Sequence, residues 1–170
     1  MKRLYFIRHG ESEMNVSGLF AGITDTPLTE KGRKQAISAG KKIKNLDIDL
    51  IVASPLSRAY DTSRLIAQET GYPVEKILLN ELFMERHYGK LEGQPYSLDL
   101  TAKDMLDAET SEVLLKRARL ALTYLETLDA KTILVVSHGS FGRALRHHVL
   151  KDFPFTHPQR IPNAEIIQLL

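Results

Sequence analysis

Two runs of consecutive apolar residues constrain the fold of this chain most strongly. Residues Leu50–Ala53 read LIVA and residues Thr132–Ser137 read TILVVS, and both runs are rich in β-branched side chains. Apolar runs without alternation are typical of strands that are covered on both faces. Such strands occur in parallel sheets with helices on either side. The two runs therefore predict the centre of an α/β sheet.

Shorter strand patterns and four helical patterns complete this arrangement. Thr29 is a suitable N-cap for the first helix, and Gly71 is a suitable stop for the second. The alternation of strands and helices predicts an α/β fold: a three-layer α/β/α sandwich with a mostly parallel central sheet, in a single domain over residues 1–170. The remaining strands are expected at Leu4–Ile7, Ile77–Leu79 and Glu165–Leu169, and the helices at residues 30–45, 57–70, 111–128 and 140–151.

Composition excludes several classes of function. The chain has 170 residues and a net charge of +2, which is too balanced to indicate a nucleic-acid or membrane partner. Cysteine is absent, so disulfides, thiol catalysis and thiolate metal sites are excluded, and we expect no metal. The first strand begins within a few residues of Met1, and no apolar run is long enough to span a membrane. We therefore expect a cytoplasmic protein without a signal peptide.

Polar residues follow four of the predicted strands. Because ligands of open α/β sheets bind at the carboxyl ends of the strands, these residues are expected to converge on one site. Convergence of four distant segments is a stronger indication than any one of them. The segments are Arg8-His9-Gly10, Ser54 to Arg58, Glu85-Arg86 and Ser137 to Ser140.

The residue types in these segments favour phosphoryl chemistry. Arg8 and Arg58 offer planar guanidinium groups that bind phosphate oxygens with two donors each. Their charges also disfavour protonation of His9, which keeps its imidazole neutral and nucleophilic. With His138 they can offset the charge of a transferring phosphoryl group, while Glu85 protonates the leaving oxygen. We interpret the set as a site for covalent catalysis through a phosphohistidine.

Each residue taken alone also has a structural interpretation. His9 at a strand end can be a hydrogen-bonded structural histidine, and His138 before a glycine can shape a turn. Arg58 in the first turn of a helix can be a solvated surface charge. Glu85 can be a carboxylate that a helix N-terminus favours. Only their joint occurrence at strand ends favours the functional interpretation.

Five motifs resemble those of one enzyme family, and together they span nearly the whole chain. They read FIRHGESEMN, GLFAGITDTPLTEKGRKQA, ASPLSRAYDTS, ERHYGKLEG and VVSHGSFGRAL. The chain thereby resembles the histidine phosphatase superfamily, which includes cofactor-dependent phosphoglycerate mutases and many small-molecule phosphatases. The resemblance implies the phosphoglycerate mutase-like fold.

The resemblance also implies roles for individual residues. His9 is the implied phosphoacceptor, Glu85 the proton donor, and Arg8, Arg58 and His138 the other catalytic residues. A second group of residues is expected to contact the substrate and its phosphate. It includes Arg86, which follows Glu85. This group consists of Asn15, Ala21, Gly22, Arg86, Tyr88, Gly139 and Ser140.

Departures from the family pattern bear on the reaction. The segment between Glu85 and His138 is short by the standards of mutases, and Tyr96 stands where mutases carry a lysine. The insert also lacks the adjacent arginine pair that holds the bisphosphate cofactor in mutases. A site with fewer cations is expected to release its product and admit water. We therefore favour a phosphatase that hydrolyses small soluble phosphate monoesters without a cofactor.

Two alternatives remain open at this stage. One is a phosphoglycerate mutase with a shortened insert, which would require 2,3-bisphosphoglycerate. The other is a non-catalytic phosphate-binding module on the same fold. Substrate choice is expected to depend on two loops that border the site, residues 92–103 and 152–162, both of which are candidates for mobile covers. The sequence supports no particular oligomeric state.

Overall fold

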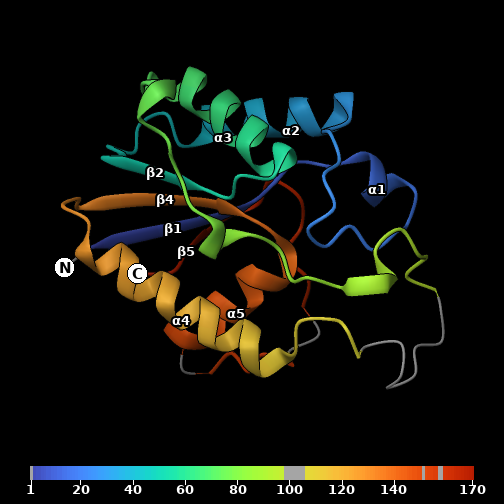
Figure 1. Cartoon of the computed structure of the whole chain (residues 1–170). Coiled ribbons are helices and arrows are strands. Elements are labelled where there is room, and N and C mark those ends of the chain that lie inside the picture. Colours follow the sequence, from blue (N-terminus) through green and yellow to red (C-terminus); the bar gives the residue numbers. More distant parts are fainter. Residues whose placement is uncertain (1, 98–105, 151, 157–158) are drawn as a thin grey trace.

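A five-stranded sheet forms the middle layer of the protein (Figure 1). The computed structural model describes residues 2–97, 106–150, 152–156 and 159–170. The strand order is β3-β2-β4-β1-β5, and only β5 runs antiparallel to its neighbour. The α/β fold and the mostly parallel sheet are thus confirmed. The strands are β1 (Arg3–Arg8), β2 (Leu50–Ala53), β3 (Leu78–Leu79), β4 (Thr132–Ser137) and β5 (Ile166–Gln168).

Helices cover both faces of this sheet. Figure 1 shows α2 and α3 on one face and α4 and α5 on the other, while α1 lies beyond the end of the sheet. The α-helices are α1 (Glu13–Val16), α2 (Glu30–Lys42), α3 (Ser57–Thr70), α4 (Ser111–Thr127) and α5 (Gly139–Val149). Among the described residues, the connections contain the 3-10 helices η1 (Val74–Lys76), η2 (Glu81–Phe83) and η3 (Gly89–Leu91).

Alternate side chains of the central strands supply two hydrophobic cores. In β4, Ile133 and Val135 belong to the core beneath α4 and α5, whereas Leu134 and Val136 belong to the core beneath α2 and α3. All six residues of this strand are buried. Burying each large aliphatic side chain contributes about 1.5–3 kcal/mol to stability. Because β4 places side chains in both cores, it holds the three layers together.

The predicted helix signals act as expected, although several bounds differ. The Thr29 hydroxyl accepts a hydrogen bond from the Gly32 N–H at 3.0 Å, and Gly71 ends α3 with a φ of 75°. The predicted start of α5 at Ser140 is wrong by one residue because His138 has extended backbone angles and caps a helix that begins at Gly139. The predicted end of α2 is also wrong, since Ile43 already leaves helical geometry.

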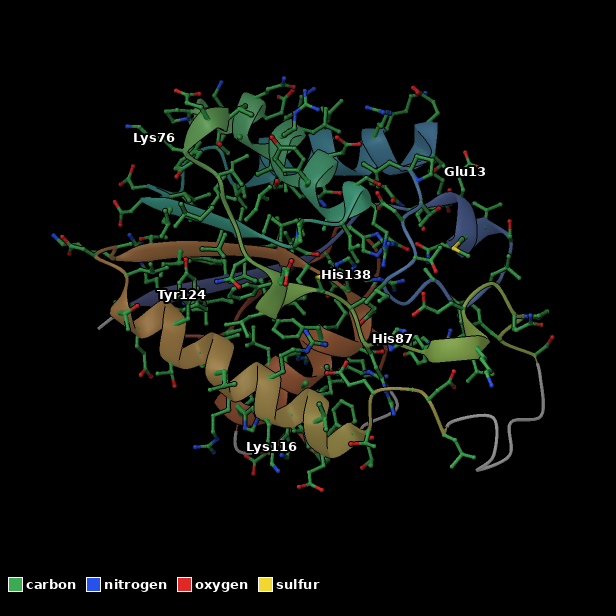
Figure 2. All side chains as sticks on the ribbon, viewed as in Figure 1. Glu13, Lys76, His87, Lys116, Tyr124 and His138 are labelled. Carbon is green, nitrogen blue, oxygen red and sulfur yellow. The ribbon has the colours of Figure 1, made fainter. Side chains whose placement is uncertain are left out.

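The carboxyl ends of the parallel strands gather the polar segments at one edge of the sheet. His9 follows β1, Ser54 follows β2 and His138 follows β4. Figure 2 shows His138 in the interior near this edge, while Lys116 lies on the outer face of α4. Within the described ranges, no helix combines the length and apolar character that a membrane crossing requires.

Candidate active site

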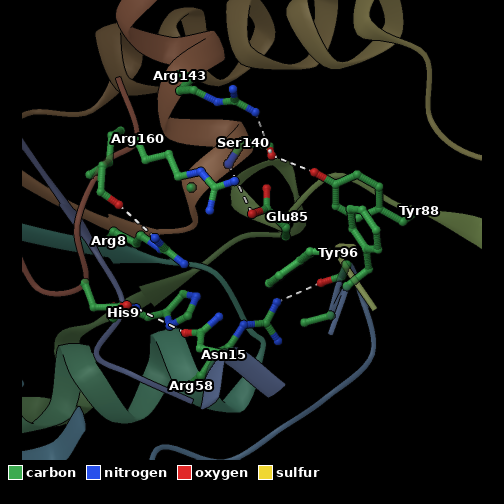
Figure 3. Close-up of a pocket in the computed structure, with 16 residues that line it drawn as sticks. Arg8, His9, Asn15, Arg58, Glu85, Tyr88, Tyr96, Ser140, Arg143 and Arg160 are labelled. Carbon is green, nitrogen blue, oxygen red and sulfur yellow. Dashed lines mark hydrogen bonds between the residues drawn. The ribbon is translucent and has the colours of Figure 1, made fainter. Parts of the chain in front are cut away.

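A cavity of about 400 Å³ opens at this edge of the sheet (Figure 3). Ten of the twelve predicted site residues line it, and the exceptions are His138 and Arg86. The predicted residues that line the cavity are Arg8, His9, Asn15, Ala21, Gly22, Arg58, Glu85, Tyr88, Gly139 and Ser140.

His9 lies at the buried end of the cavity with 3% of its surface exposed. Its Nδ1 atom lies 2.6 Å from the carbonyl oxygen of Gly10. A carbonyl oxygen only accepts, so Nδ1 carries the proton and Nε2 keeps its lone pair. Burial, followed by the charges of Arg58 and Arg8, holds the pKa of His9 well below its ordinary value. The imidazole is therefore neutral near pH 7 and presents Nε2 as its nucleophilic atom.

His138 lies next to His9 rather than on the cavity wall. The two ring centroids are 5.1 Å apart, and His138 is fully buried. Its Nε2 atom is 2.8 Å from the hydroxyl oxygen of Ser54, whereas its Nδ1 atom is buried without a partner among the described residues. Burial lowers the pKa of His138, and Arg58 and His9 lower it further. Two adjacent histidines are thus both kept neutral.

Arg8 and Arg58 hold their guanidinium groups with backbone carbonyls. Arg8 donates to Ile161 at 2.8 Å, and Arg58 donates to Gly22 at 2.7 Å and to Thr24 at 3.0 Å. The Nε atom of each arginine is buried without a partner among the described residues. Buried donors are normally satisfied, so these unpaired N–H groups are suited to an anionic oxygen.

The carboxylate of Glu85 lies at the N-terminus of α5. One oxygen accepts from the Arg86 N–H at 2.8 Å and the Phe141 N–H at 3.0 Å, and the other accepts from the Ser140 N–H at 3.1 Å. The structure thus combines both interpretations of this residue, because the helix-start carboxylate also lines the cavity. Three backbone donors from two segments fix its position.

Further hydrogen bonds connect the predicted binding residues. Asn15 accepts through its side-chain oxygen from the Asn163 amide at 3.2 Å, and the same amide donates to the His9 carbonyl at 2.9 Å. The Tyr88 hydroxyl lies 2.7 Å from the Ser140 hydroxyl, either of which can donate. Segments from both ends of the chain therefore meet around His9.

Arg86 is not among the residues that line the cavity, and its contact with substrate stays a prediction. Its Nε atom donates to the carbonyl of Glu109 at 2.7 Å, and its guanidinium lies 5.6 Å from the centre of the Tyr88 ring. These two contacts hold the side chain outside the cavity. Gly10 leaves no room for a side chain, because a Cβ there would lie 2.3 Å from the carbonyl oxygen of Gly32. This glycine therefore permits close packing against α2.

Sequence reasoning missed part of the lining, including two arginines. Arg143 lies one helical turn after Ser140 on α5, so the helix period was an available signal. Arg160 lies in a segment without regular structure, where no pattern indicates side-chain direction. Four arginines line the cavity, and the sequence identified only Arg8 and Arg58 among them. The other missed residues are Phe20, Tyr96, Ile161 and Asn163.

The two loops expected to border the site do so in their described parts. Tyr96 comes from the first loop, and Arg160 and Ile161 come from the second. Residues 98–103 and 157–158 lie outside the described residues. No group of three or more metal-ligating side chains occurs in the part of the chain that the structure describes.

Known proteins with similar sequences and structures include both mutases and phosphatases. A 2,3-bisphosphoglycerate-dependent phosphoglycerate mutase of Streptococcus pyogenes serotype M5 is 34% identical over 199 residues, covering 88% of this chain and 84% of the mutase. A mycobacterial glucosyl-3-phosphoglycerate phosphatase in complex with VO3 superposes with a TM-score of 0.85 at 25% identity, covering 99% and 92% of the two chains.

A third comparison gives the same fold. The alpha-ribazole phosphatase from Shigella flexneri superposes with a TM-score of 0.82 at 26% identity, covering 96% of this chain and 88% of the phosphatase. The sequence model of the Histidine phosphatase superfamily (branch 1) matches residues 4–169. A match over nearly the whole length, with the cavity at the strand ends, confirms the resemblance on which the site was predicted. The chain belongs to the histidine phosphatase superfamily, branch 1.

Proposed function

We propose that this protein is a phosphatase that hydrolyses small phosphate monoesters through a phosphohistidine on His9. The observation that carries the proposal is the state of this residue. Its imidazole is buried and neutral, its Nδ1 proton is donated to Gly10, and Arg8 and Arg58 lie beside it. This combination supplies a nucleophilic nitrogen together with the positive charge that a phosphoryl group requires.

The reaction has two steps. In the first, Nε2 of His9 attacks phosphorus, the bond to the ester oxygen breaks, and Glu85 gives its proton to the departing alcohol. In the second, water attacks phosphorus, Glu85 takes a proton from that water, and the P–N bond breaks to release inorganic phosphate. The unpaired Nε donors of Arg8 and Arg58 are suited to bind the phosphoryl oxygens in both steps.

The dimensions of the site support a small substrate. Pockets for small molecules measure about 300–1,000 Å³, and this cavity lies near the lower end of that range. Its buried end is charged, whereas Phe20 packs against the rings of Tyr88 and Tyr96 at centroid distances of 5.0 and 4.8 Å. An ester with a compact leaving group suits a cavity of this size.

A transient phosphoenzyme and loss of activity on substitution of His9 test the proposal. The purified protein is expected to release phosphate from p-nitrophenyl phosphate and from members of a sugar-phosphate panel. His9→Ala is expected to lower turnover on the order of 10³-fold or more. His147→Gln, in the last turn of α5, is the matched control. Acid-labile radioactive phosphate on the wild-type chain would support the intermediate, and wild-type turnover by His9→Ala would refute it.

A phosphoglycerate mutase is the second candidate. It is supported by the 34% identity to a curated mutase and by the four arginines of the cavity. Against it stands the length of that alignment, because 199 aligned positions exceed the 170 residues of this chain, so the mutase has residues that this chain lacks. The short segment after Glu85 remains the main reason to favour hydrolysis.

A coupled assay separates hydrolysis from phosphoryl transfer. Conversion of 3-phosphoglycerate to 2-phosphoglycerate is measured with 2,3-bisphosphoglycerate present, beside the release of inorganic phosphate. Phosphatase activity is expected to exceed mutase activity, and the opposite result would favour the mutase. Phosphate binding with no turnover on any ester would instead support a non-catalytic binding module.

A further inference from the structure

The cavity carries more positive charge than one phosphoryl group needs. Four arginines line it, whereas Glu85 is its only lining carboxylate among the described residues. His9 is neutral, so it adds no charge. A phosphate monoester brings at most two negative charges, which Arg8 and Arg58 can balance. With Glu85 ionised the lining keeps one positive charge more than the ester brings, and with Glu85 protonated it keeps two.

Those two arginines, Arg143 and Arg160, have no acidic partner within the described ranges. None of the ion pairs of the structure includes either residue. Arg143 donates only a long hydrogen bond, at 3.3 Å, to the Ser140 hydroxyl, and its guanidinium lies 5.6 Å from the Phe155 ring centre. Burial is the main cause of the lowered pKa of Arg8, and the positive charges of Arg160 and Arg143 contribute to it. Glu85 opposes this lowering, so it compensates part of the positive charge around Arg8.

Proximity to His9 distinguishes an inner from an outer pair, because Arg58 and Arg8 lower the pKa of His9 and the other two arginines are not among its causes. Arg58 is 1% exposed, Arg8 and Arg143 are half-buried, and Arg160 is exposed. Figure 3 shows Arg160 extending into the cavity and Arg143 above Ser140. A phosphoryl group held at His9 directs its leaving group outward. That leaving group therefore meets Arg143 and Arg160.

We propose that Arg143 and Arg160 form a second anion subsite, so that the preferred substrate carries a carboxylate or a second phosphoryl group on its leaving group. This inference rests on the proposed phosphatase function and specifies its substrate class. Arg143 comes from α5 and Arg160 from the C-terminal segment. Both lie outside the segment between Glu85 and His138, where mutases carry their arginine pair. Arginine suits both anions because its planar donors bind carboxylate and phosphate alike.

Matched pairs of esters test the subsite. 3-Phosphoglycerate and glycerol 3-phosphate differ by a carboxylate against a hydroxymethyl group, and fructose 1,6-bisphosphate and fructose 1-phosphate differ by one phosphate. The wild-type protein is expected to prefer the doubly anionic ester in at least one pair by about tenfold in kcat/KM. The pair that shows the preference identifies the second anion.

The double substitution Arg143→Gln, Arg160→Gln is expected to reduce this preference on the order of tenfold. Arg119→Gln, an exposed residue of α4, removes one charge elsewhere and should leave the preference unchanged. The single variant Arg160→Gln alters an exposed side chain and serves if the double variant does not fold. Equal kcat/KM within both pairs, or a preference that survives the double substitution, would overturn the subsite.

Binding measurements separate this inference from the proposed function. The variant His9→Ala is titrated calorimetrically with 3-phosphoglycerate and with glycerol 3-phosphate, so that no turnover is required. Tighter binding of 3-phosphoglycerate that weakens on Arg160→Gln supports the subsite even if no ester is hydrolysed. Normal hydrolysis with no such difference refutes the subsite and leaves the phosphatase proposal standing.

Discussion

At the scale of single residues, burial sets the chemical state of His9. Burial is the largest cause of its lowered pKa, with the charges of Arg58 and Arg8 next. The same burial affects His138, whose ring lies 5.1 Å from that of His9. A strand end in the core thus converts an ordinary histidine into a neutral base that stays unprotonated in mildly acidic solution.

The pH dependence of activity is expected to show this state. A histidine with a lowered pKa remains neutral until the pH falls below its ordinary value of about 6.5. The acidic limb of kcat/KM for p-nitrophenyl phosphate should therefore lie below pH 6.5, once the titration of the substrate itself is subtracted. An acidic limb at or above pH 6.5 would show that the free imidazole is not held neutral by its surroundings.

The effect of Glu85 on the rate is expected to depend on how much the leaving group needs a proton. An alkyl alcohol needs a proton as it departs, whereas p-nitrophenolate leaves without one. Glu85→Gln is therefore expected to lower kcat/KM, which reports formation of the phosphoenzyme, for an alkyl phosphate by about 10²–10⁴-fold and to lower kcat/KM for p-nitrophenyl phosphate far less. Steady-state kinetics with both esters measure the two effects. Equal losses would assign Glu85 to structural support of α5, whose N-terminal amides it accepts.

Single residues also show where sequence reasoning ends. Arg86 follows Glu85 directly, yet it is held outside by Glu109 and Tyr88. Arg143 and Arg160 lie outside the polar segments that were singled out at the strand ends, yet both line the cavity. A motif identifies which residue types are present. Side-chain direction depends on partners elsewhere in the chain, and these partners are not readable from local spacing.

At the scale of elements, one carboxylate joins two loops of the site. Glu92 accepts from the Ile23 N–H at 3.1 Å, the Thr24 N–H at 2.8 Å, the Thr24 hydroxyl at 2.5 Å and the Tyr88 N–H at 3.0 Å. The carbonyls of Gly22 and Thr24 in turn accept from Arg58. Gly22 has a φ of 52°, and a Cβ there would lie 2.2 Å from the Glu92 carboxylate. Glu92 therefore positions Arg58 through the loop.

The substitution Glu92→Gln tests this connection. The amide nitrogen of glutamine donates rather than accepts, so some of the N–H groups now held by the carboxylate lose their acceptor. We expect kcat/KM to fall on the order of tenfold or more and the free energy of unfolding to fall by about 1–3 kcal/mol. Activity assays and urea denaturation measure the two effects. Glu75→Gln, an exposed residue of η1, is the control, and wild-type activity in Glu92→Gln would exclude a positioning role.

At the scale of the whole molecule, the fold was the most predictable property. The runs LIVA and TILVVS are the adjacent central strands β2 and β4, because unbroken apolar sequence suits only positions covered on both faces. The short edge strands were predicted less well. β3 has two residues and β5 three, and their pairing depends on neighbours more than on their own sequence. The edge at which the site assembles followed from topology alone.

The two buried histidines also make the stability of the whole molecule depend on pH. Both have pKa values well below 6.5 in the folded state, whereas an unfolded chain has a histidine pKa of about 6.5. Between these values only the unfolded state takes up the two protons, so their contribution to stability is fully present above pH 6.5 and is lost as the pH falls. The slope approaches about 1.4 kcal/mol per pH unit for each histidine.

Urea denaturation at several pH values between 7 and 5 measures this loss. The lowered pKa values of the Glu11 and Asp49 carboxyls affect stability only at lower pH, because their ordinary values are 4.5 and 3.8. His138→Gln removes one titrating group and retains a hydrogen-bonding side chain opposite Ser54. It is expected to halve the slope of unfolding free energy against pH in this range. A wild-type slope near zero would mean that the folded and unfolded states take up protons alike, so that burial does not keep the two histidines neutral below pH 6.5.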